Sequence, residues 1–138
     1  NVDTNFLINA LQSNYIPVIA PLGFNKNNEI FNINADDVAC SIAASISAEK
    51  LILMTDQEGV LNDNGELLTN LDVTEVKKLI KKEIISGGML PKVNACITAL
   101  GGGVKKTHII DGRVEHAVLL ELFTNTGIGT LVKKWLKL

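Results

Sequence analysis

A four-residue apolar run, Leu51 to Met54, constrains the fold of this 138-residue chain more than any other feature of its sequence. Such a continuous run is typical of a strand buried on both faces of a parallel sheet. It leads into a polar segment, Thr55 to Gly59, and lies between two stretches with helical spacing, 35–47 and 72–82. Because parallel neighbouring strands need crossover connections that are usually helices, the run predicts an α/β fold.

The remainder of the chain repeats the alternation of helix and strand. Apolar spacing and capping residues, among them Asp72 and Glu75 at capping-box spacing, predict helices at 4–13, 35–47, 72–82, 89–100 and 117–123. Short apolar runs predict strands at 16–20, 29–33, 51–54, 104–110 and 129–134. We expect one domain, built as a three-layer αβα sandwich around an open, mostly parallel sheet. Ligands of such sheets bind beyond the carboxyl ends of the strands, which points to 21–23, 55–59 and the residues from Asp111 onward.

Composition argues against several classes of protein. A net charge of −2 gives no basic surface for nucleic acid, and no apolar run approaches the roughly 20 residues that span a bilayer. A single arginine, Arg113, against twelve lysines, together with abundant Asn and Ile, indicates an AT-rich bacterial or plastid genome. We therefore expect a soluble protein of the cytoplasm or plastid stroma, with no nucleic-acid or membrane partner.

The cysteines and histidines give no sign of a metal site or a nucleophile. Cys40 and Cys96 each lie in an apolar helical stretch, where a thiol usually serves as a small hydrophobe. His108 lies in a predicted strand and His116 at a predicted helix start, so both are interpreted as structural. No spacing suits a zinc site, and we expect no metal ligands.

Three polar segments could carry chemistry, and each has a structural alternative. The segment 32–37 places polar groups at a helix start, which would suit an anion or simply a cap. The segment 54–61 could bring a carboxylate to a ribose or a metal, or be an ordinary exit from a strand. In 86–92, Lys92 follows two glycines and could meet a phosphate as a point charge, or only be exposed. None of the three has a Walker or dinucleotide fingerprint.

Taken together, these segments resemble the acetylglutamate kinases of the amino acid kinase family. The resemblance covers nearly the whole chain and is carried by five blocks in order: Ile16–Gly23, Asn32–Asp36, Leu53–Leu61, Gly87–Val93 and Ile109–Arg113. It implies a carbamate kinase-like fold and transfer of a phosphoryl group from ATP to N-acetyl-L-glutamate in arginine biosynthesis. ATP with Mg²⁺ would be the co-substrate, with no tightly bound cofactor.

The resemblance also implies roles for individual residues. Asn32 would contact the acetylglutamate, Asp36 would organise the catalytic lysines, and Lys92 would stabilise charge on the transferred phosphoryl group. The ATP site would be lined by Asp56, Gln57, Glu58, Gly59, Val60, Leu61, Ile84, Ile85 and Ser86.

The C-terminal block 116–130 resembles that of acetylglutamate kinases inhibited by arginine. There Glu121 would face the guanidinium of the effector, and backbone near Gly127 would form part of its pocket. The alternative is a helix end followed by a glycine turn. Relatives of this kind form homo-oligomers, and some bind the nitrogen-sensing PII protein, which is a candidate partner.

The resemblance places residues 1–138 as the C-terminal, ATP-binding portion of a kinase domain whose N-terminal half is absent. The chain starts at Asn1 with a helix under way by Thr4, so we expect a cut amino end and an inactive isolated fragment. The rival interpretations are another amino acid kinase, of the aspartokinase, carbamate kinase or UMP kinase type, and a non-catalytic ATP-binding module. A dinucleotide-binding domain is disfavoured because no glycine fingerprint follows a strand.

Overall fold

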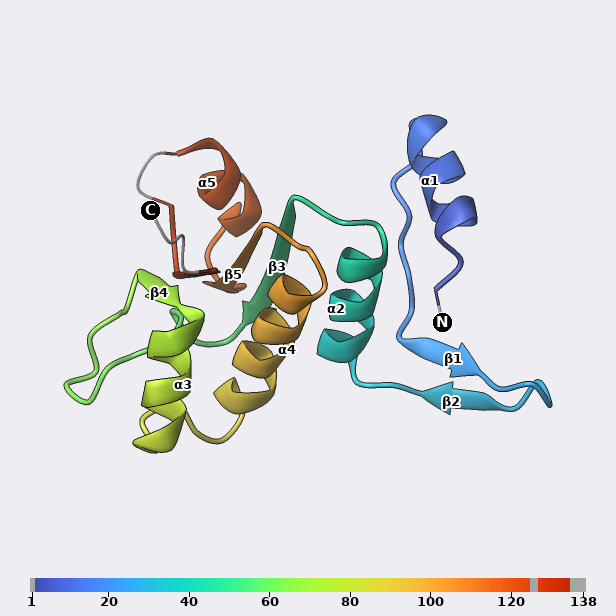
Figure 1. Ribbon diagram of the computed structural model, residues 1–138. Helices are drawn as coiled ribbons and strands as arrows, with labels where there is room; N and C mark the ends of the chain where they lie inside the picture. The colour runs from blue at the N-terminus through green and yellow to red at the C-terminus, as the bar shows by residue number, and fades with distance from the viewer. Residues whose placement is uncertain (1, 125–126, 135–138) are drawn as a thin grey trace.

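The computed structural model describes residues 2–124 and 127–134, and Figure 1 shows the course of the chain. In chain order the elements are α1 (Thr4–Gln12), β1 (Leu22–Phe24), β2 (Ile30–Asn32), α2 (Ala35–Ser45), β3 (Lys50–Thr55), β4 (Asn70–Asp72), α3 (Val73–Lys81), α4 (Met89–Gly101), β5 (Lys106–Asp111), α5 (Ala117–Phe123) and β6 (Thr130–Lys133). Helices and strands are interspersed, with β1–β2, β3–β4 and α3–α4 consecutive. The five predicted helices are confirmed, with ends that shift by at most two residues.

Four strands form one mixed sheet in the order β3-β5-β6-β4. β3 and β5 pair in parallel from Lys50 opposite Lys106 to Thr55 opposite Asp111. β4 and β6 are also parallel, whereas β5 and β6 are antiparallel. The predicted mostly parallel sheet is thus confirmed, with β6 as the reversed strand. β4 was not predicted, because it is three residues long and ends at the aspartate that caps α3.

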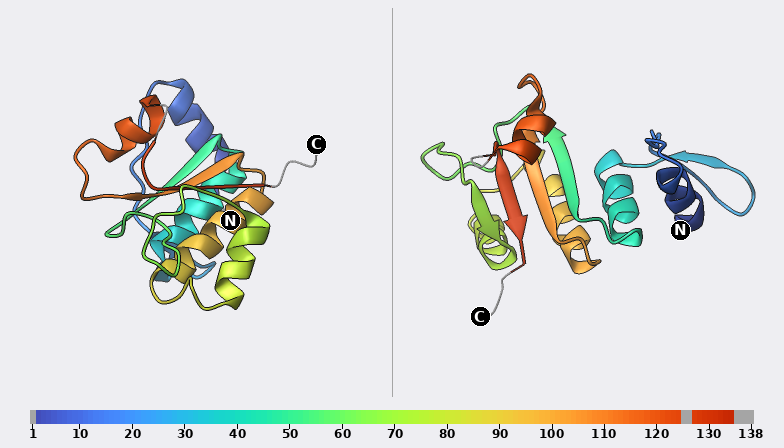
Figure 2. Two further views of the ribbon diagram at one scale, coloured as in Figure 1. Left: turned by 90° about the vertical axis from the view of Figure 1, so that its left-hand side faces the viewer. Right: turned by 90° about the horizontal axis from the view of Figure 1, so that it is seen from above.

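The helices cover both faces of this sheet. α2, α3 and α4 lie on one face, and α5 packs against β5 on the other, as the left view of Figure 2 shows. This is the predicted three-layer arrangement. The core lies between α4 and the sheet, where Val93, Cys96 and Leu100 meet Ile109 and Val132, all with no exposed area.

Burial of the strands differs from the prediction in one respect. In β3, Leu51 and Leu53 are buried while Met54 is half exposed, so the expected burial of 51–54 on both faces is wrong. β3 is the end strand of the four-stranded sheet, and α2 and α4 pack against it. Burial on both faces occurs instead in β5, whose residues from Thr107 to Asp111 are all buried between α4 and α5.

The first part of the chain stands apart from the sheet. α1 and the β1–β2 hairpin lie beyond α2 in Figure 1. The strand predicted at 16–20 is wrong, since those residues have no strand structure and Val18 is 95% exposed. A strand requires hydrogen-bonding neighbours, and the described residues supply none to this segment. Residues 21–23 lead into the separate β1–β2 hairpin. They therefore do not lie at the edge of the four-stranded sheet where 55–59 and Asp111 lie, and the ligand position expected there is wrong.

Side-chain caps fix the starts of three helices, and at α1 the side chain of Asp3 accepts from the backbone N–H groups of Asn5 and Phe6. Asp72 accepts from the backbone N–H groups of Thr74 (2.6 Å) and Glu75 (2.8 Å), and Glu75 accepts from the N–H of Asp72 (2.8 Å). This confirms the predicted capping box of α3. Asn34 caps α2 in a similar way, by accepting from Asp36 and Asp37. Among the described helices, none is long and apolar enough to cross a membrane.

Candidate functional site

A cleft of about 490 Å³ opens at the carboxyl end of β3. Its walls are the loop that follows β3, the segment that precedes α4, and the first turn of α4. This volume lies within the range of sites for small ligands, roughly 300–1,000 Å³. The lining residues are Thr55, Asp56, Gln57, Gly59, Val60, Leu61, Asn62, Ile84, Ile85, Ser86, Gly88, Met89 and Lys92.

Two segments that are far apart in the sequence meet in this cleft. Of the nine residues expected to line an ATP site, eight do line it, and the ninth, Glu58, is exposed outside it. Thr55, Asn62, Gly88 and Met89 also contribute and were not expected. The position of the cleft agrees with the rule that ligands bind beyond the carboxyl ends of strands.

The loop after β3 is held by β6. The backbone N–H of Val60 donates to the buried hydroxyl of Thr130 at 2.8 Å. Gly59 has a φ of +148°, and a Cβ on it would lie 2.6 Å from Thr130 Oγ1. A residue with a side chain therefore cannot take this position without displacing the loop. β6 thus shapes the wall of the cleft.

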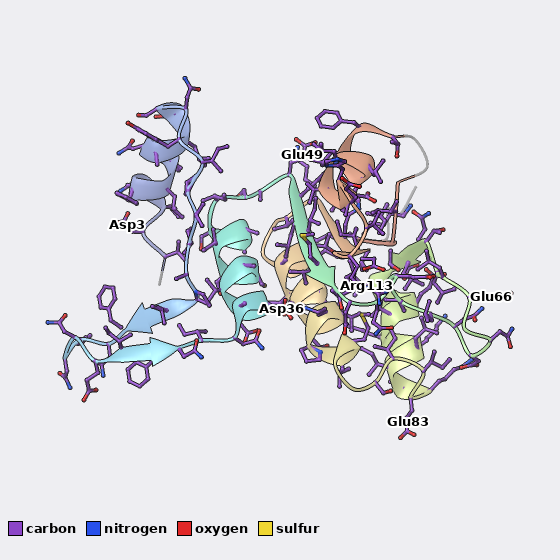
Figure 3. The ribbon with its side chains drawn as sticks, turned by 180° about the vertical axis from the view of Figure 1, so that it is seen from behind. Asp3, Asp36, Glu49, Glu66, Glu83 and Arg113 are labelled. Atoms are coloured by element: carbon purple, nitrogen blue, oxygen red, sulfur yellow. The ribbon has the colours of Figure 1, made fainter. Side chains whose placement is uncertain are left out.

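A charge pair lies at one end of the cleft. Lys92, in the first turn of α4, donates from Nζ to both carboxylate oxygens of Asp36, at 3.1 and 3.2 Å. Asp36 lies in the first turn of α2, and Figure 3 shows it between α2 and α4. The two side chains are about one-fifth exposed, at 20% and 19%. The predicted catalytic residues are therefore adjacent, with the ammonium fixed beside the cleft.

Asn32, the expected substrate contact, is not part of the cleft lining. It ends β2, is exposed, and lies two residues before the helix cap Asn34. Asn32 is therefore close in sequence to the start of α2, and its side chain is exposed to solvent.

A second polar cluster links β5 to α5 and to the residues that precede β6. Glu121 accepts from the backbone N–H of Ile128 at 2.8 Å, and its other oxygen lies 2.5 Å from Nδ1 of His108. Gly127 has a φ of +57°, and a Cβ there would lie 2.9 Å from Glu121 Oε2. Glu121 and Gly127, expected as parts of one effector pocket, are therefore in contact.

His108 in this cluster was interpreted from the sequence only as a structural residue. Burial lowers its pKa, and the neighbouring Glu121 carboxylate acts in the opposite direction. The neutral ring then donates from Nδ1 to Glu121, which leaves Nε2 as an acceptor. Nε2 is buried and has no partner among the described residues. No sequence signal connects the two residues, because their contact depends on how α5 packs on β5.

The residues after β5 lie beside the end of β3, but none of the described residues from Asp111 onward lines the cleft. The N–H of Gly112 donates to the carbonyl of Thr55 at 2.7 Å, which ties the end of β5 to the end of β3. Hydrogen bonds from Arg113 lower the pKa of Asp111 to about 2. Figure 3 shows Arg113 beside the arrowhead of β3.

Both thiols are buried and free, as expected for small hydrophobes. Burial raises the pKa of Cys96 to about 11, so this thiol stays protonated at neutral pH.

This α/β fold, with a mixed sheet and a cleft beyond β3, is similar to known proteins. The sequence profile of the amino acid kinase family matches residues 1–111, and the chain belongs to this family. It is 56% identical over 133 residues to the acetylglutamate kinase of Pelobacter propionicus, which is 96% of this chain and 46% of that protein. The chain thus spans about half the length of the curated relatives it matches.

Solved structures agree with this assignment. The N-acetylglutamate synthase of Neisseria gonorrhoeae, solved in complex with coenzyme A and L-arginine, superposes with a TM-score of 0.92 and 31% identity. The match covers 98% of this chain and 31% of the synthase chain. The carbamate kinase of Giardia lamblia bound to AMP-PNP superposes at a TM-score of 0.72 with 21% identity, over 98% of this chain and 46% of that one. This second likeness shows the fold.

Proposed function

We propose that the protein containing this chain phosphorylates the side-chain carboxylate of N-acetyl-L-glutamate with ATP, giving N-acetyl-L-glutamyl 5-phosphate for arginine biosynthesis. The observation that carries the proposal is the 56% identity to an acetylglutamate kinase over 96% of the chain. The cleft beside Lys92 is where the nucleotide would bind.

The residues of the cleft suit a reaction that depends on position and charge. A carboxylate oxygen of the acceptor attacks the γ-phosphorus of ATP, the bond to the β-phosphate oxygen breaks, and ADP leaves. Mg²⁺ would enter with ATP as part of the co-substrate. Catalysis of such transfers is mainly alignment and neutralisation of charge, and no covalent enzyme intermediate is needed.

Lys92 would supply that neutralisation from the chain. Its ammonium lies at the amino-terminal turn of α4, where the helix dipole also favours anions. Asp36 holds Nζ in place through two contacts, at 3.1 and 3.2 Å, so that the charge is already positioned when the nucleotide arrives. Asn32, exposed at the end of β2, would contact the acetylglutamate.

The test is acyl phosphate formation by the intact protein, trapped with hydroxylamine, with N-acetylglutamate or aspartate as acceptor. Product with N-acetylglutamate alone supports the proposal. Product with aspartate alone would move the protein to the aspartokinases, and carbamate and UMP are the acceptors for the remaining rivals. ATP binding without any product would leave a nucleotide-binding module.

The 138-residue chain by itself should be inactive. It corresponds to about half of its curated relatives, and the exposed apolar segment 16–20 has no strand neighbours among the described residues. Turnover by the purified chain would contradict this. Adding the remaining part of the kinase in trans and recovering product would support it.

We also propose feedback inhibition by arginine at the cluster of Glu121, Gly127 and His108. A guanidinium has donors only, and this cluster offers a buried carboxylate and the acceptor Nε2 of His108, which has no partner among the described residues. The synthase from Neisseria gonorrhoeae, 31% identical to this chain, was solved with L-arginine. The family resemblance further suggests a homo-oligomer in the bacterial cytoplasm or plastid stroma, with PII as a candidate partner. Gel filtration and PII pull-down would test these points.

A further inference from the structure

Arg113, the only arginine of the chain, is held rigidly just beyond the end of β5. Its Nη2 donates to Asp111 Oδ2 at 2.8 Å, and its Nε donates to Oδ1 at 2.9 Å. Its backbone N–H also donates to Oδ1, at 2.9 Å. The Asp111 side chain is 11% exposed and that of Arg113 is 65% exposed. A two-point ion pair of this kind fixes both the position and the orientation of the guanidinium.

This pair is joined to the loop that forms the cleft. Asp111 lies opposite Thr55 in the parallel ladder, and Gly112 donates to the Thr55 carbonyl at 2.7 Å. Thr55 is the first residue of the loop wall. The turn that carries Arg113 is therefore fastened to the point where the loop leaves the sheet.

The loop carries two carboxylates, Asp56 and Glu58, whose charges act on this guanidinium. The hydrogen bonds to Asp111 raise the pKa of Arg113, and the charges of Asp56 and Glu58 raise it further. Asp56 lines the cleft, and Glu58 lies just outside it. Lys92 is the one cation among the described lining residues, and it is already paired with Asp36. A polyphosphate that enters the cleft thus meets the carboxylate of Asp56, with Glu58 just outside the lining, and Arg113 is a second positive charge near this loop besides Lys92.

We propose that Arg113, fixed by Asp111, is a positioning residue of the nucleotide site that holds the acidic loop 55–59 in place and offsets its charge against the phosphates of ATP. The inference rests on the proposed kinase function for the identity of the ligand. It assigns to Asp111 and Arg113 a role that does not require contact with the transferred group.

The experiment measures dissociation constants of ATP and adenosine by titration calorimetry on the intact protein that contains this chain. Arg113→Gln should weaken ATP binding about fivefold, the scale of a partly exposed ion pair. Adenosine, which has no phosphates, should change less than twofold. Arg113→Lys keeps the positive charge but loses the two-point contact with Asp111, so its ATP affinity should lie between those of the unaltered protein and Arg113→Gln. It also replaces Arg113→Gln in the comparison if that variant folds poorly. Lys105→Gln, an equal change of charge at the other end of β5, is the control and should bind both ligands normally.

A second comparison isolates the charge. Adding Glu58→Gln to Arg113→Gln removes a carboxylate that Arg113 offsets, and it should recover part of the lost ATP affinity. Equal losses for ATP and adenosine, no loss for either, or no recovery in the double variant would overturn the proposal. If the unaltered protein binds ATP but phosphorylates no acetylglutamate, the proposed function fails while these binding comparisons still decide the role of Arg113.

Discussion

Lys92 and Asp36 are 56 positions apart in the sequence, yet Nζ of the lysine lies 3.1 Å from Oδ2 of the aspartate. Each side chain comes from the first turn of its helix, so the packing of α2 against α4 sets the distance between them. The pair is only one-fifth exposed, and it lies at the end of the cleft where the moving phosphoryl group would be. The position of the ammonium is therefore built into the contact between two helices.

If the proposed function holds, replacing Lys92 with alanine in the intact protein should lower kcat by about 100-fold or more, the usual result of losing one preorganised charge-stabilising group. The KM values for ATP and acetylglutamate should change far less, because this charge acts mainly on the transition state. Steady-state kinetics with hydroxylamine trapping would measure both. Lys92→Arg is the matched variant, and equal losses in kcat and in binding would identify Lys92 as chiefly a binding residue.

Replacing Gly59 with alanine should destabilise the protein by about 1–3 kcal/mol and weaken ATP binding. The φ of +148° disfavours any side chain, and the new Cβ would collide with Thr130 Oγ1 at 2.6 Å. Urea denaturation and ATP titration would measure the two effects. Gly101→Ala is the control, since a Cβ there meets nothing within 4 Å and its φ is ordinary. A stable Gly59→Ala variant with normal ATP affinity would show that the loop adapts.

Changing Glu121 to glutamine should raise the arginine concentration needed for half-inhibition by about tenfold, as expected when a charged hydrogen-bond partner of a guanidinium is lost. Gly127→Ala should act in the same direction, because its Cβ would press on the Glu121 carboxylate. Arginine titrations, each scaled to the variant's own arginine-free rate, would measure this. If arginine does not inhibit the unaltered protein, the effector proposal is wrong.

The contribution of Asp111 to the stability of the protein should decrease at acid pH. Hydrogen bonds from Arg113 lower its folded pKa from 3.8 to about 2, so the folded state favours the carboxylate. Its contribution is complete above the unfolded pKa and is lost as the pH falls from 3.8 toward 2. The difference in urea midpoint between the unaltered protein and Asp111→Asn should therefore shrink from about pH 5 to about pH 2.5. Arg113→Gln should reproduce the effect, and a difference independent of pH would contradict it.

Much of the cleft could be predicted because its walls are short continuous segments. A buried apolar strand followed by a glycine-containing polar loop indicates a ligand site at the strand end, and of the residues 55–59 that this rule gave, all but Glu58 line the cleft. Val60, Leu61 and residues 84–86 were expected only from the family resemblance. Contacts that depend on how helices pack on strands could not be predicted from the sequence. The link between His108 and Glu121 requires the register of α5 on β5, which no local pattern contains.

The misplaced strands have similar physical reasons. The segment 16–20 has the composition of a strand, but composition does not provide hydrogen-bonding neighbours, and the described residues offer none. β4 is three residues long and shares Asp72 with the cap of α3, so the helix signal dominates there. The reversal of β6 also cannot be inferred from its sequence, because this four-residue strand pairs in parallel on one side and antiparallel on the other, and so short a segment has no pattern that separates the two.

The place of β6 in the sheet also determines when the sheet can be completed during synthesis of the chain. β6 comes last among the described strands, yet it lies between β5 and β4 and supplies the hydroxyl that holds Val60. Until Thr130 has left the ribosome, β4 has no neighbour in the sheet and the wall of the cleft lacks its anchor. A nascent chain would thus carry an open strand edge and an incomplete cleft wall until this strand has been made. A product that terminated before this strand would lack the hydroxyl that holds Val60 and the neighbour that pairs with β4.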